Sequence, residues 1–329
     1  MVHPLTRKSV LGMVAVAAVL AAACSSGGGH QAVAGVEKPD LTVAAVPALD
    51  SAGLYIAQQR GLFAAQGLHV TIVPAISSAT VIAAQQAGKY DVTSGAYVAY
   101  MLADAQQHAN LRIIAPGSNM APLTQEVMVP PGSPIQHVRE LKGKKIGVNA
   151  LNNVGTLLIS SLLTDNGVPP SDVTFVAIPF PAMAAALKAH QVDAAWLPEP
   201  FITGAEESMG ATALADVDQG ATQSIPVSGY IVTQSWLNKY PKTAAAFRRA
   251  ILEAQAIANT SLAAVQDGMV AYGGVSLTTA QIAAAPTFPL QTNEPLLQRI
   301  AGLMEQFGMT QQIFNVKQMI RGLNPVILG

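Results

Sequence analysis

The stretch Leu41-Thr-Val-Ala-Ala-Val46 opens the part of the chain that decides its fold. It is short, uncharged and mostly apolar, which is typical of a buried β-strand. A helical pattern follows from Leu54 to about Ala65, and Leu68-His-Val-Thr-Ile-Val73 then alternates as a second strand. A second helix and a short strand at Val92-Thr-Ser94 complete a β-α-β-α-β unit.

The same order of patterns returns later in the chain. Ile146-Gly-Val148 predicts a strand, and helical and extended stretches follow it up to a third strand that begins at Ala194. In both copies a glycine closes the first helix and an aspartate precedes the third strand. The separations are 24 residues (67 to 91) and 26 residues (167 to 193). We therefore expect Asp91 and Asp193 to be structural turn residues rather than a functional carboxylate pair.

Strand–helix alternation predicts parallel sheets with right-handed crossovers, so the sequence predicts an α/β fold with two βαβαβ-type lobes. We expect lobe I to comprise residues 41–124 plus about 234–329, and lobe II to comprise residues 125–233. Extended segments at Gln125-Glu-Val-Met-Val129 and Ser228-Gly-Tyr-Ile-Val-Thr233 are expected to carry the chain between the lobes. Ligands settle beyond the carboxyl ends of parallel strands, so we expect a cleft between the lobes that closes by hinge motion.

A secretory signal precedes this repeat. After two basic residues, an uninterrupted apolar run extends from Val10 to Ala23, too short for a membrane span of about 20 residues. It ends at Cys24 in a segment that resembles a lipobox, with Ala21 where a large aliphatic residue is usual. We predict a signal peptide over residues 1–23 and an acylated Cys24 with a flexible tether over residues 24–40. The alternative is an ordinary signal peptide with Cys24 as a bystander.

The composition argues against several classes of protein. Eighteen basic and 19 acidic residues give a net charge of −1, so no basic face for nucleic acid is expected. A single cysteine allows no disulfide within one chain, and the six histidines lack metal-ligand spacing. Phosphate-binding and nucleophile-elbow motifs do not occur in the sequence. We expect a monomer without a metal or cofactor.

Three stretches carry a family resemblance. They are Ala57-Gln-Gln-Arg-Gly-Leu-Phe-Ala-Ala-Gln-Gly-Leu-His-Val70, Leu141-Lys-Gly-Lys-Lys-Ile-Gly-Val148 and Val192-Asp-Ala-Ala-Trp-Leu-Pro-Glu-Pro200. Together they resemble the nitrate/sulfonate/taurine solute-binding proteins of ABC transporters, whose wider group includes thiamine-pyrimidine binders and pyrimidine-synthase proteins. The resemblance covers about Leu41 to Phe201. It implies a type-II periplasmic-binding-protein fold, an outward-facing place at the cell membrane and delivery of a small-molecule solute to an ABC permease.

Loops at the predicted carboxyl ends of the strands supply the candidate ligand-binding residues. In lobe I they are Asp50, Ser51, Ser77, Ser78, Thr80, Ser94, Tyr97 and Asn119, and in lobe II they are Asn152, Asn153, Thr156, Phe180, Trp196 and Glu199. Serine, threonine and asparagine at helix starts also serve as caps, so the loops at 77–78 and 152–156 stay open between capping and binding. Core packing is the alternative for Tyr97 and Trp196.

Two of these candidates suggest the chemistry of the ligand. The indole of Trp196 could stack on a ring or cover an amine, and the carboxylate of Glu199 would accept an N–H donor and repel a dianion. The candidate loops contain no lysine or arginine, so a bare anion would depend on helix dipoles alone. We therefore expect an amine-bearing sulfonate, similar to taurine, or a neutral nitrogen heterocycle such as a pyrimidine.

Two other functions remain as alternatives to transport. A lipoprotein of this kind could sense its ligand and report to a membrane receptor. The pyrimidine-synthase proteins make an enzyme conceivable, but their chemistry is associated with a cysteine-rich segment and an intracellular location. One cysteine at the end of a signal peptide favours a binding protein over an enzyme.

Overall fold

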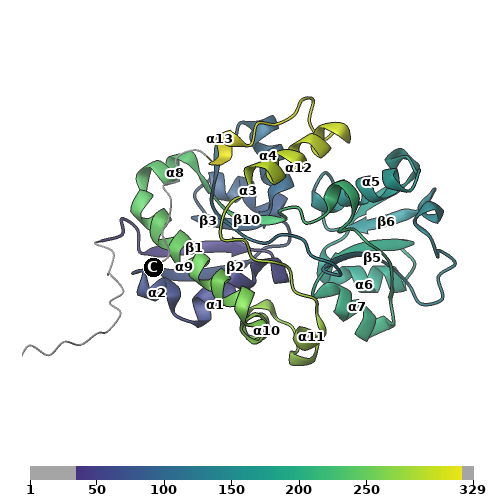
Figure 1. Ribbon diagram of the computed structural model, residues 1–329, viewed down its shortest axis with the longest axis horizontal. Coiled ribbons are helices and arrows are strands. Elements are labelled where there is room, and N and C mark those ends of the chain that lie inside the picture. The colour runs from purple at the N-terminus through teal and green to yellow at the C-terminus, as the bar shows by residue number, and fades with distance from the viewer. Residues whose placement is uncertain (1–34, 321–329) are drawn as a thin grey trace, which may run out of the picture. The chain divides into compact units, whose positions relative to one another are not determined.

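The computed structural model describes residues 35–320, and the predicted signal peptide and Cys24 lie outside them. Two five-stranded sheets with flanking helices make up this part of the chain (Figure 1). The predicted α/β class with two lobes is confirmed. No helix among the described residues has both the length and the apolar character needed to cross a bilayer.

Both sheets have the same strand order. In space, the first sheet runs β2 (His69–Pro74), β1 (Asp40–Ala45), β3 (Val92–Ala96), β10 (Ser228–Thr233) and β4 (Leu111–Pro116). The second runs β7 (Thr174–Ala177), β6 (Lys145–Val148), β8 (Ala194–Pro198), β5 (Gln125–Val129) and β9 (Thr212–Asp216). The first three strands of each sheet are parallel, and the fourth is antiparallel to both of its neighbours. The repeated sequence pattern therefore corresponds to a repeated topology.

The two segments expected to carry the crossings are these fourth strands. The chain enters β5 after residues 117–124 and enters β10 after residues 217–227. The lobe II expected from sequence extends to residue 233, whereas β10 pairs with β3 and β4 in the first sheet. A strand prediction from local sequence cannot say which sheet will accept the strand. With β10 moved to the first sheet, the lobe boundaries remain a proposal.

The helices of the repeat follow their strands as the sequence predicts. They are α1 (Ala52–Gln59), α2 (Leu62–Ala65), α3 (Ser78–Gln86) and α4 (Tyr97–Gln107) beside the first sheet, and α5 (Val154–Asp165), α6 (Phe180–Lys188) and α7 (Phe201–Met209) beside the second. The expected single helix from Leu54 to Ala65 is broken at Gly61, whose φ of 69° lies in the left-handed region that favours glycine. Helix-propagating backbone cannot continue through that residue.

The C-terminal third consists of helices that pack mainly on the first sheet. They are α8 (Gln234–Lys239), α9 (Pro241–Thr260), α10 (Leu262–Gly268), α11 (Leu277–Ile282), α12 (Glu294–Gln306) and α13 (Lys317–Ile320). The long helix α9 packs against α1 and α2 (Figure 1), while α12 contacts both α4 and α5, and α11 contacts α7. The C-terminal helices thus join helices of the two sheets.

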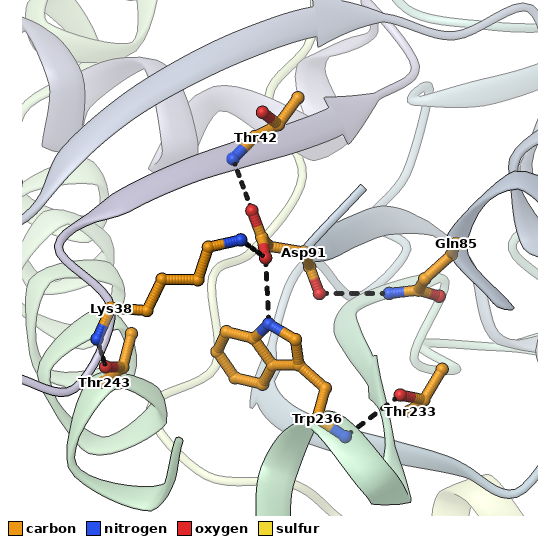
Figure 2. A network of polar contacts seen from close by, with 7 residues as sticks. All are labelled: Lys38, Thr42, Gln85, Asp91, Thr233, Trp236 and Thr243. Atoms are coloured by element: carbon orange, nitrogen blue, oxygen red, sulfur yellow. Dashed lines mark hydrogen bonds and ion pairs between the residues drawn. The ribbon is translucent and has the colours of Figure 1, made fainter. Parts of the chain in front are cut away.

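The aspartate of each repeat has the structural role expected of it. Asp91 accepts the backbone N–H of Thr42 at 2.9 Å and donates its own N–H to the carbonyl of Thr42 at 2.9 Å. Asp193 makes the equivalent pair with Lys145, at 2.8 Å in both directions. Each aspartate therefore fastens the turn before the third strand to the first strand of its sheet. Figure 2 shows that Asp91 additionally binds the Nζ atom of Lys38 and the indole nitrogen of Trp236.

Candidate functional site

A cavity lies where the carboxyl ends of β1, β3, β6 and β8 meet. Its volume is about 40 Å³, and about 440 Å³ when the open solvent at its mouth is included. It is lined by residues of both sheets: Val46, Ala48, Asp50, Ser51, Ser78, Gly95, Ala96, Asn149, Asn153, Val154, Phe180, Trp196, Pro198, Val227 and Ser228. The loop of residues 46–51 and the end of β8 therefore face the same space, and the N–H of Leu49 donates to the carbonyl of Glu199 at 3.1 Å.

Asp50 is the one charged side chain that lines the cavity within residues 35–320. It lies in a 3-10 turn, Leu49–Ser51, between β1 and α1. Its carboxylate accepts a hydrogen bond from the hydroxyl of Ser118 at 2.5 Å, and the Oγ atoms of Ser118 and Ser228 lie 3.0 Å apart. Burial raises the pKa of Asp50, and the Ser118 hydroxyl opposes part of that rise. An ionised Asp50 would be stabilised by a cationic or N–H-bearing solute in this cavity.

Three buried polar atoms of the opposite wall have no hydrogen-bond partner among the described residues. They are Asn149 Oδ1, Asn153 Nδ2 and Trp196 Nε1. The amide of Asn153 is fixed in orientation because its Oδ1 accepts the N–H of Val154 at 2.8 Å, so its Nδ2 is the donor left over. A buried polar group without a partner costs about 1–3 kcal/mol. The second sheet thus presents two donors and one acceptor on residues that line the cavity.

Three helices begin at the cavity. Ser78 starts α3, Val154 starts α5 and Phe180 starts α6, and each of these residues lines the cavity. Free N–H groups and the helix dipole give a helix N-terminus a partial positive charge that favours anions. Together with the carboxylate of Asp50, this produces a site with one negative group and a positive backbone field, which suits a solute that carries charges of both signs.

The indole of Trp196 is held in place by close packing. It is 2% exposed, and its ring centroid lies 5.5 Å from that of Phe180 at an interplanar angle of 55°. On its other side is Gly155, where a Cβ atom would come within 2.5 Å of the indole. Trp196 is therefore a core residue and a cavity wall at once, so the two interpretations from sequence do not exclude each other.

Six of the fourteen candidate residues line the cavity. They are Asp50, Ser51, Ser78, Asn153, Phe180 and Trp196. The structure places the other eight outside the lining: Ser77, Thr80, Ser94, Tyr97, Asn119, Asn152, Thr156 and Glu199. As ligand contacts, all fourteen residues stay predictions.

Several of the residues outside the lining organise the loops around it. Thr156 exchanges contacts with Asn153 in a capping box at the start of α5, and Thr80 donates to the carbonyl of Ser77 at 2.8 Å beside the start of α3. Asn119 forms β-bridges to Pro226 and Thr287. The remaining positions in this group are the buried Ser94 and Tyr97, and the exposed Asn152.

Glu199 uses its carboxylate within the protein. The N–H and hydroxyl of Thr203 donate to it at 3.1 and 2.8 Å, and the N–H of Ala284 donates at 3.3 Å. Burial raises the pKa of Glu199, and these hydrogen bonds oppose the rise. The carboxylate therefore caps the start of α7 and fastens it to the C-terminal third. Asp50, not Glu199, is the acidic side chain that lines the cavity.

Sequence reasoning missed nine lining residues. They are Val46, Ala48, Gly95, Ala96, Asn149, Val154, Pro198, Val227 and Ser228. Asn149 follows β6 directly and Ser228 begins β10, so both lie at the cavity edge of their sheets. The rule that sites lie at strand ends could have found these two, whereas the apolar residues and glycine carry no chemical signal.

Glu126 is a buried carboxylate in β5 whose pKa is raised by burial and by its acidic neighbours. Burial, followed by the negative charges of Asp216, Glu206 and Glu199, raises the pKa of Glu126 to about 7. This is above the ordinary value of about 4.5, so the folded state binds the proton more tightly than the unfolded state. The stabilisation is complete below about pH 4.5 and is lost as the pH rises through 7.

We expect the protein to lose about 1–2 kcal/mol of unfolding free energy between pH 5 and pH 8 through Glu126, after solvent screening is allowed for. Glu126→Gln should remove this loss because a neutral amide carries no ionisation cost. Urea unfolding at both pH values measures the effect. Parallel pH profiles for the wild type and the variant would contradict the assignment.

Comparison with known proteins establishes the family. A family model described as NMT1/THI5 like matches residues 48–260, which include the loop of Asp50 and the whole second sheet. The chain belongs to the NMT1/THI5-like family. The resemblance noted in the sequence is thereby confirmed.

Relatives of this NMT1/THI5-like chain include binding proteins and an enzyme. It is 25% identical over 295 residues to the nitrate/nitrite binding protein NrtA of Nostoc sp. strain PCC 7120, covering 78% of this chain and 67% of that one. The alkanesulfonate-binding protein SsuA from Xanthomonas axonopodis pv. citri, solved bound to MOPS, has a TM-score of 0.75 at 17% identity and covers 87% and 99% of the two chains. The desulfurization enzyme DszB has a TM-score of 0.65 at 17% identity, with 86% and 96% covered. The two structural likenesses concern the fold alone.

Proposed function

We propose that the chain is the extracytoplasmic solute-binding component of an ABC importer and closes around a small amine-bearing organic solute. The observation that carries this proposal is the cavity whose walls come from both sheets, with Asp50 on one side and unpaired polar atoms on the other. The names of NrtA and SsuA, both binding proteins for small solutes, support it. Acylation of Cys24, attachment to the outer face of the membrane and docking on an ABC permease belong to the same proposal.

The charges around the cavity favour a solute with an amine. Asp50 is the only charged residue in its lining within the described range, and it would repel a bare anion. The starts of α3, α5 and α6 would favour a negative group elsewhere in the same molecule. An amine-bearing sulfonate satisfies both, and a neutral nitrogen heterocycle could place an N–H on Asp50.

Binding is favoured over catalysis by the chemistry of the lining. Ser51, Ser78 and Ser228 are the hydroxyl groups in it, no histidine, cysteine or lysine of the described range lines the cavity, and the carboxylate of Asp50 is bonded to Ser118 rather than to any of the three. A serine nucleophile needs a base within hydrogen-bond reach. The enzyme DszB shares the fold, which does not decide function.

The solute class can be tested with three small compounds. We expect 2-aminoethanesulfonate to raise the melting temperature of the purified protein, because a ligand at 100 times its Kd adds about 2.7 kcal/mol to stability. Ethanesulfonate and nitrate should give little or no shift, because neither can bind Asp50. A nitrate shift as large as that of the amine would contradict the proposal. Native mass spectrometry of the protein purified from cells would identify a solute that copurifies with it.

A further inference from the structure

A second cavity adjoins the first. Its volume is about 470 Å³, and its lining includes Pro47, Phe180, Leu197, Phe201 and Gly204. Phe180 lines both cavities. Pro47 and Leu197 line the second cavity, and their sequence neighbours Val46, Ala48, Trp196 and Pro198 line the first. In a strand such as β8, successive side chains point to opposite sides, which explains how adjacent residues can face different cavities.

The aromatic rings form a continuous series from one cavity to the other. The ring of Phe180 tilts against Trp196 in the first cavity and stacks on Phe201 in the second, with centroids 5.0 Å apart and an interplanar angle of 23°. Pro47 and Pro198 are stiff, and the backbone of β8 is held in the sheet. Phe180 is 5% exposed and is the side chain that both linings share, so a path between the two cavities requires a change of its rotamer.

The second cavity has the chemistry of an apolar site. No charged side chain of the described residues lines it, and its three hydroxyl groups are already bonded within the protein. Ser208 donates to the carbonyl of Gly204 at 2.6 Å, Ser276 and Thr279 share a hydrogen bond at 2.8 Å, and Thr279 donates to Glu207 at 2.7 Å. Proline, phenylalanine, leucine, valine and alanine supply most of the remaining wall. The protons of these hydroxyl groups are already used, whereas a hydrocarbon or aromatic group in this cavity would be removed from water.

We propose that the second cavity receives an apolar arm of the solute whose amine binds Asp50, with Phe180 turning aside to join the two spaces. This inference rests on the proposed function and narrows its ligand class to amines with a hydrocarbon or aromatic substituent on or near the nitrogen. Asp50 and Pro47 belong to the same loop, which contributes to both linings.

Gly204 offers a way to block the second cavity alone. It lies within α7, and a Cβ atom there would meet no other atom within 4 Å. Leucine at this position therefore fills the cavity without displacing backbone. Gly302, in the middle of α12, has the same helical setting and the same open space, and it lines neither cavity. Gly302→Leu is the matched control.

The test compares 2-aminoethanesulfonate with N-cyclohexyl-2-aminoethanesulfonate, which adds an apolar ring to the same amine, by calorimetric titration. We expect the ring to increase affinity at least tenfold in the wild type. Gly204→Leu should reduce that gain to less than twofold and leave the affinity for 2-aminoethanesulfonate within twofold. Gly302→Leu should preserve the full gain. If Gly204→Leu fails to fold, Phe201→Ala tests the same wall and should also reduce the gain.

Three results would overturn the proposal. Equal affinities of the two compounds for the wild type would show that the arm has no subsite, while the proposed function would survive through the binding of 2-aminoethanesulfonate. A Gly204→Leu variant that weakens both compounds alike, or retains the full gain, would place the ring elsewhere. Failure of both compounds to bind the wild type would reject the aminosulfonate class itself, and this inference would fall with it.

Discussion

Replacing Asp50 by asparagine is expected to lower the affinity for 2-aminoethanesulfonate about 100-fold and to leave the fold intact. The amide keeps the shape of the side chain and can still accept the Ser118 hydroxyl. It loses the negative charge, and a hydrogen bond between charged groups contributes about 1.5–3 kcal/mol, or roughly 10- to 150-fold in affinity. Because burial raises the pKa of Asp50, ionisation destabilises the folded protein. The variant should therefore melt at the same temperature as the wild type or slightly higher.

Glu199→Gln is the control that separates the two acidic candidates. Its carboxylate binds Thr203 and Ala284 rather than lining the cavity, so we expect a loss of stability with the affinity changed less than threefold. Calorimetric titration measures the affinity of Asp50→Asn and Glu199→Gln for 2-aminoethanesulfonate, and thermal unfolding measures their stability. If Glu199→Gln abolishes binding while Asp50→Asn does not, the assignment of Asp50 is wrong and the expectation from sequence is restored.

The second large effect concerns the two aspartates of the repeat. We expect Asp91→Ala to lower the free energy of unfolding by about 2–4 kcal/mol, and Asp193→Ala by about 0.5–1.5 kcal/mol. Both variants lose a hydrogen bond to the first strand of their sheet. Asp91→Ala also removes the hydrogen-bond acceptor of Lys38 Nζ and of the indole N–H of Trp236, which both bind the same carboxylate (Figure 2). Urea unfolding measures the difference, and neither variant should change the affinity for solute.

A third variant identifies the source of that difference. Lys38→Met keeps the unbranched apolar stem of the side chain and removes its charge, and Lys38 is partly exposed, so we expect a loss of about 1 kcal/mol. The remaining cost of Asp91→Ala would then come from the donors of Thr42 and Trp236. Equal losses in Asp91→Ala and Asp193→Ala would show that the additional contacts in the first sheet contribute nothing.

Local patterns were sufficient to predict the repeated unit but not the membership of every strand. The strands and helices of both copies appear where periodicity predicts them, because each buries one face against its neighbours. Ser228–Thr233 is different. Its local pattern predicts a strand but not a partner, and its place between β3 and β4 depends on residues more than a hundred positions earlier in the chain.

The site could be located from sequence, but the roles of its acidic residues could not. The rule that ligands lie beyond strand ends placed Asp50, Asn153 and Trp196 at one cavity. Asp50 and Glu199 both lie near prolines in loops after strands, and nothing local distinguishes them. The carboxylate of Glu199 accepts a hydrogen bond from the N–H of Ala284, which lies 85 positions later in the chain. Such a contact depends on the packing of the C-terminal third, which carries no periodic signal for it.

The strand order also determines when the first sheet can be completed during folding. In the first sheet, β10 lies between β3 and β4, so that sheet stays split until residue 233 has been synthesised. Contacts this distant along the chain form slowly, because a long loop must close before they stabilise anything. Export, as proposed for this chain, requires a precursor that is still unfolded when it crosses the membrane. Late completion of the first sheet would favour that unfolded state.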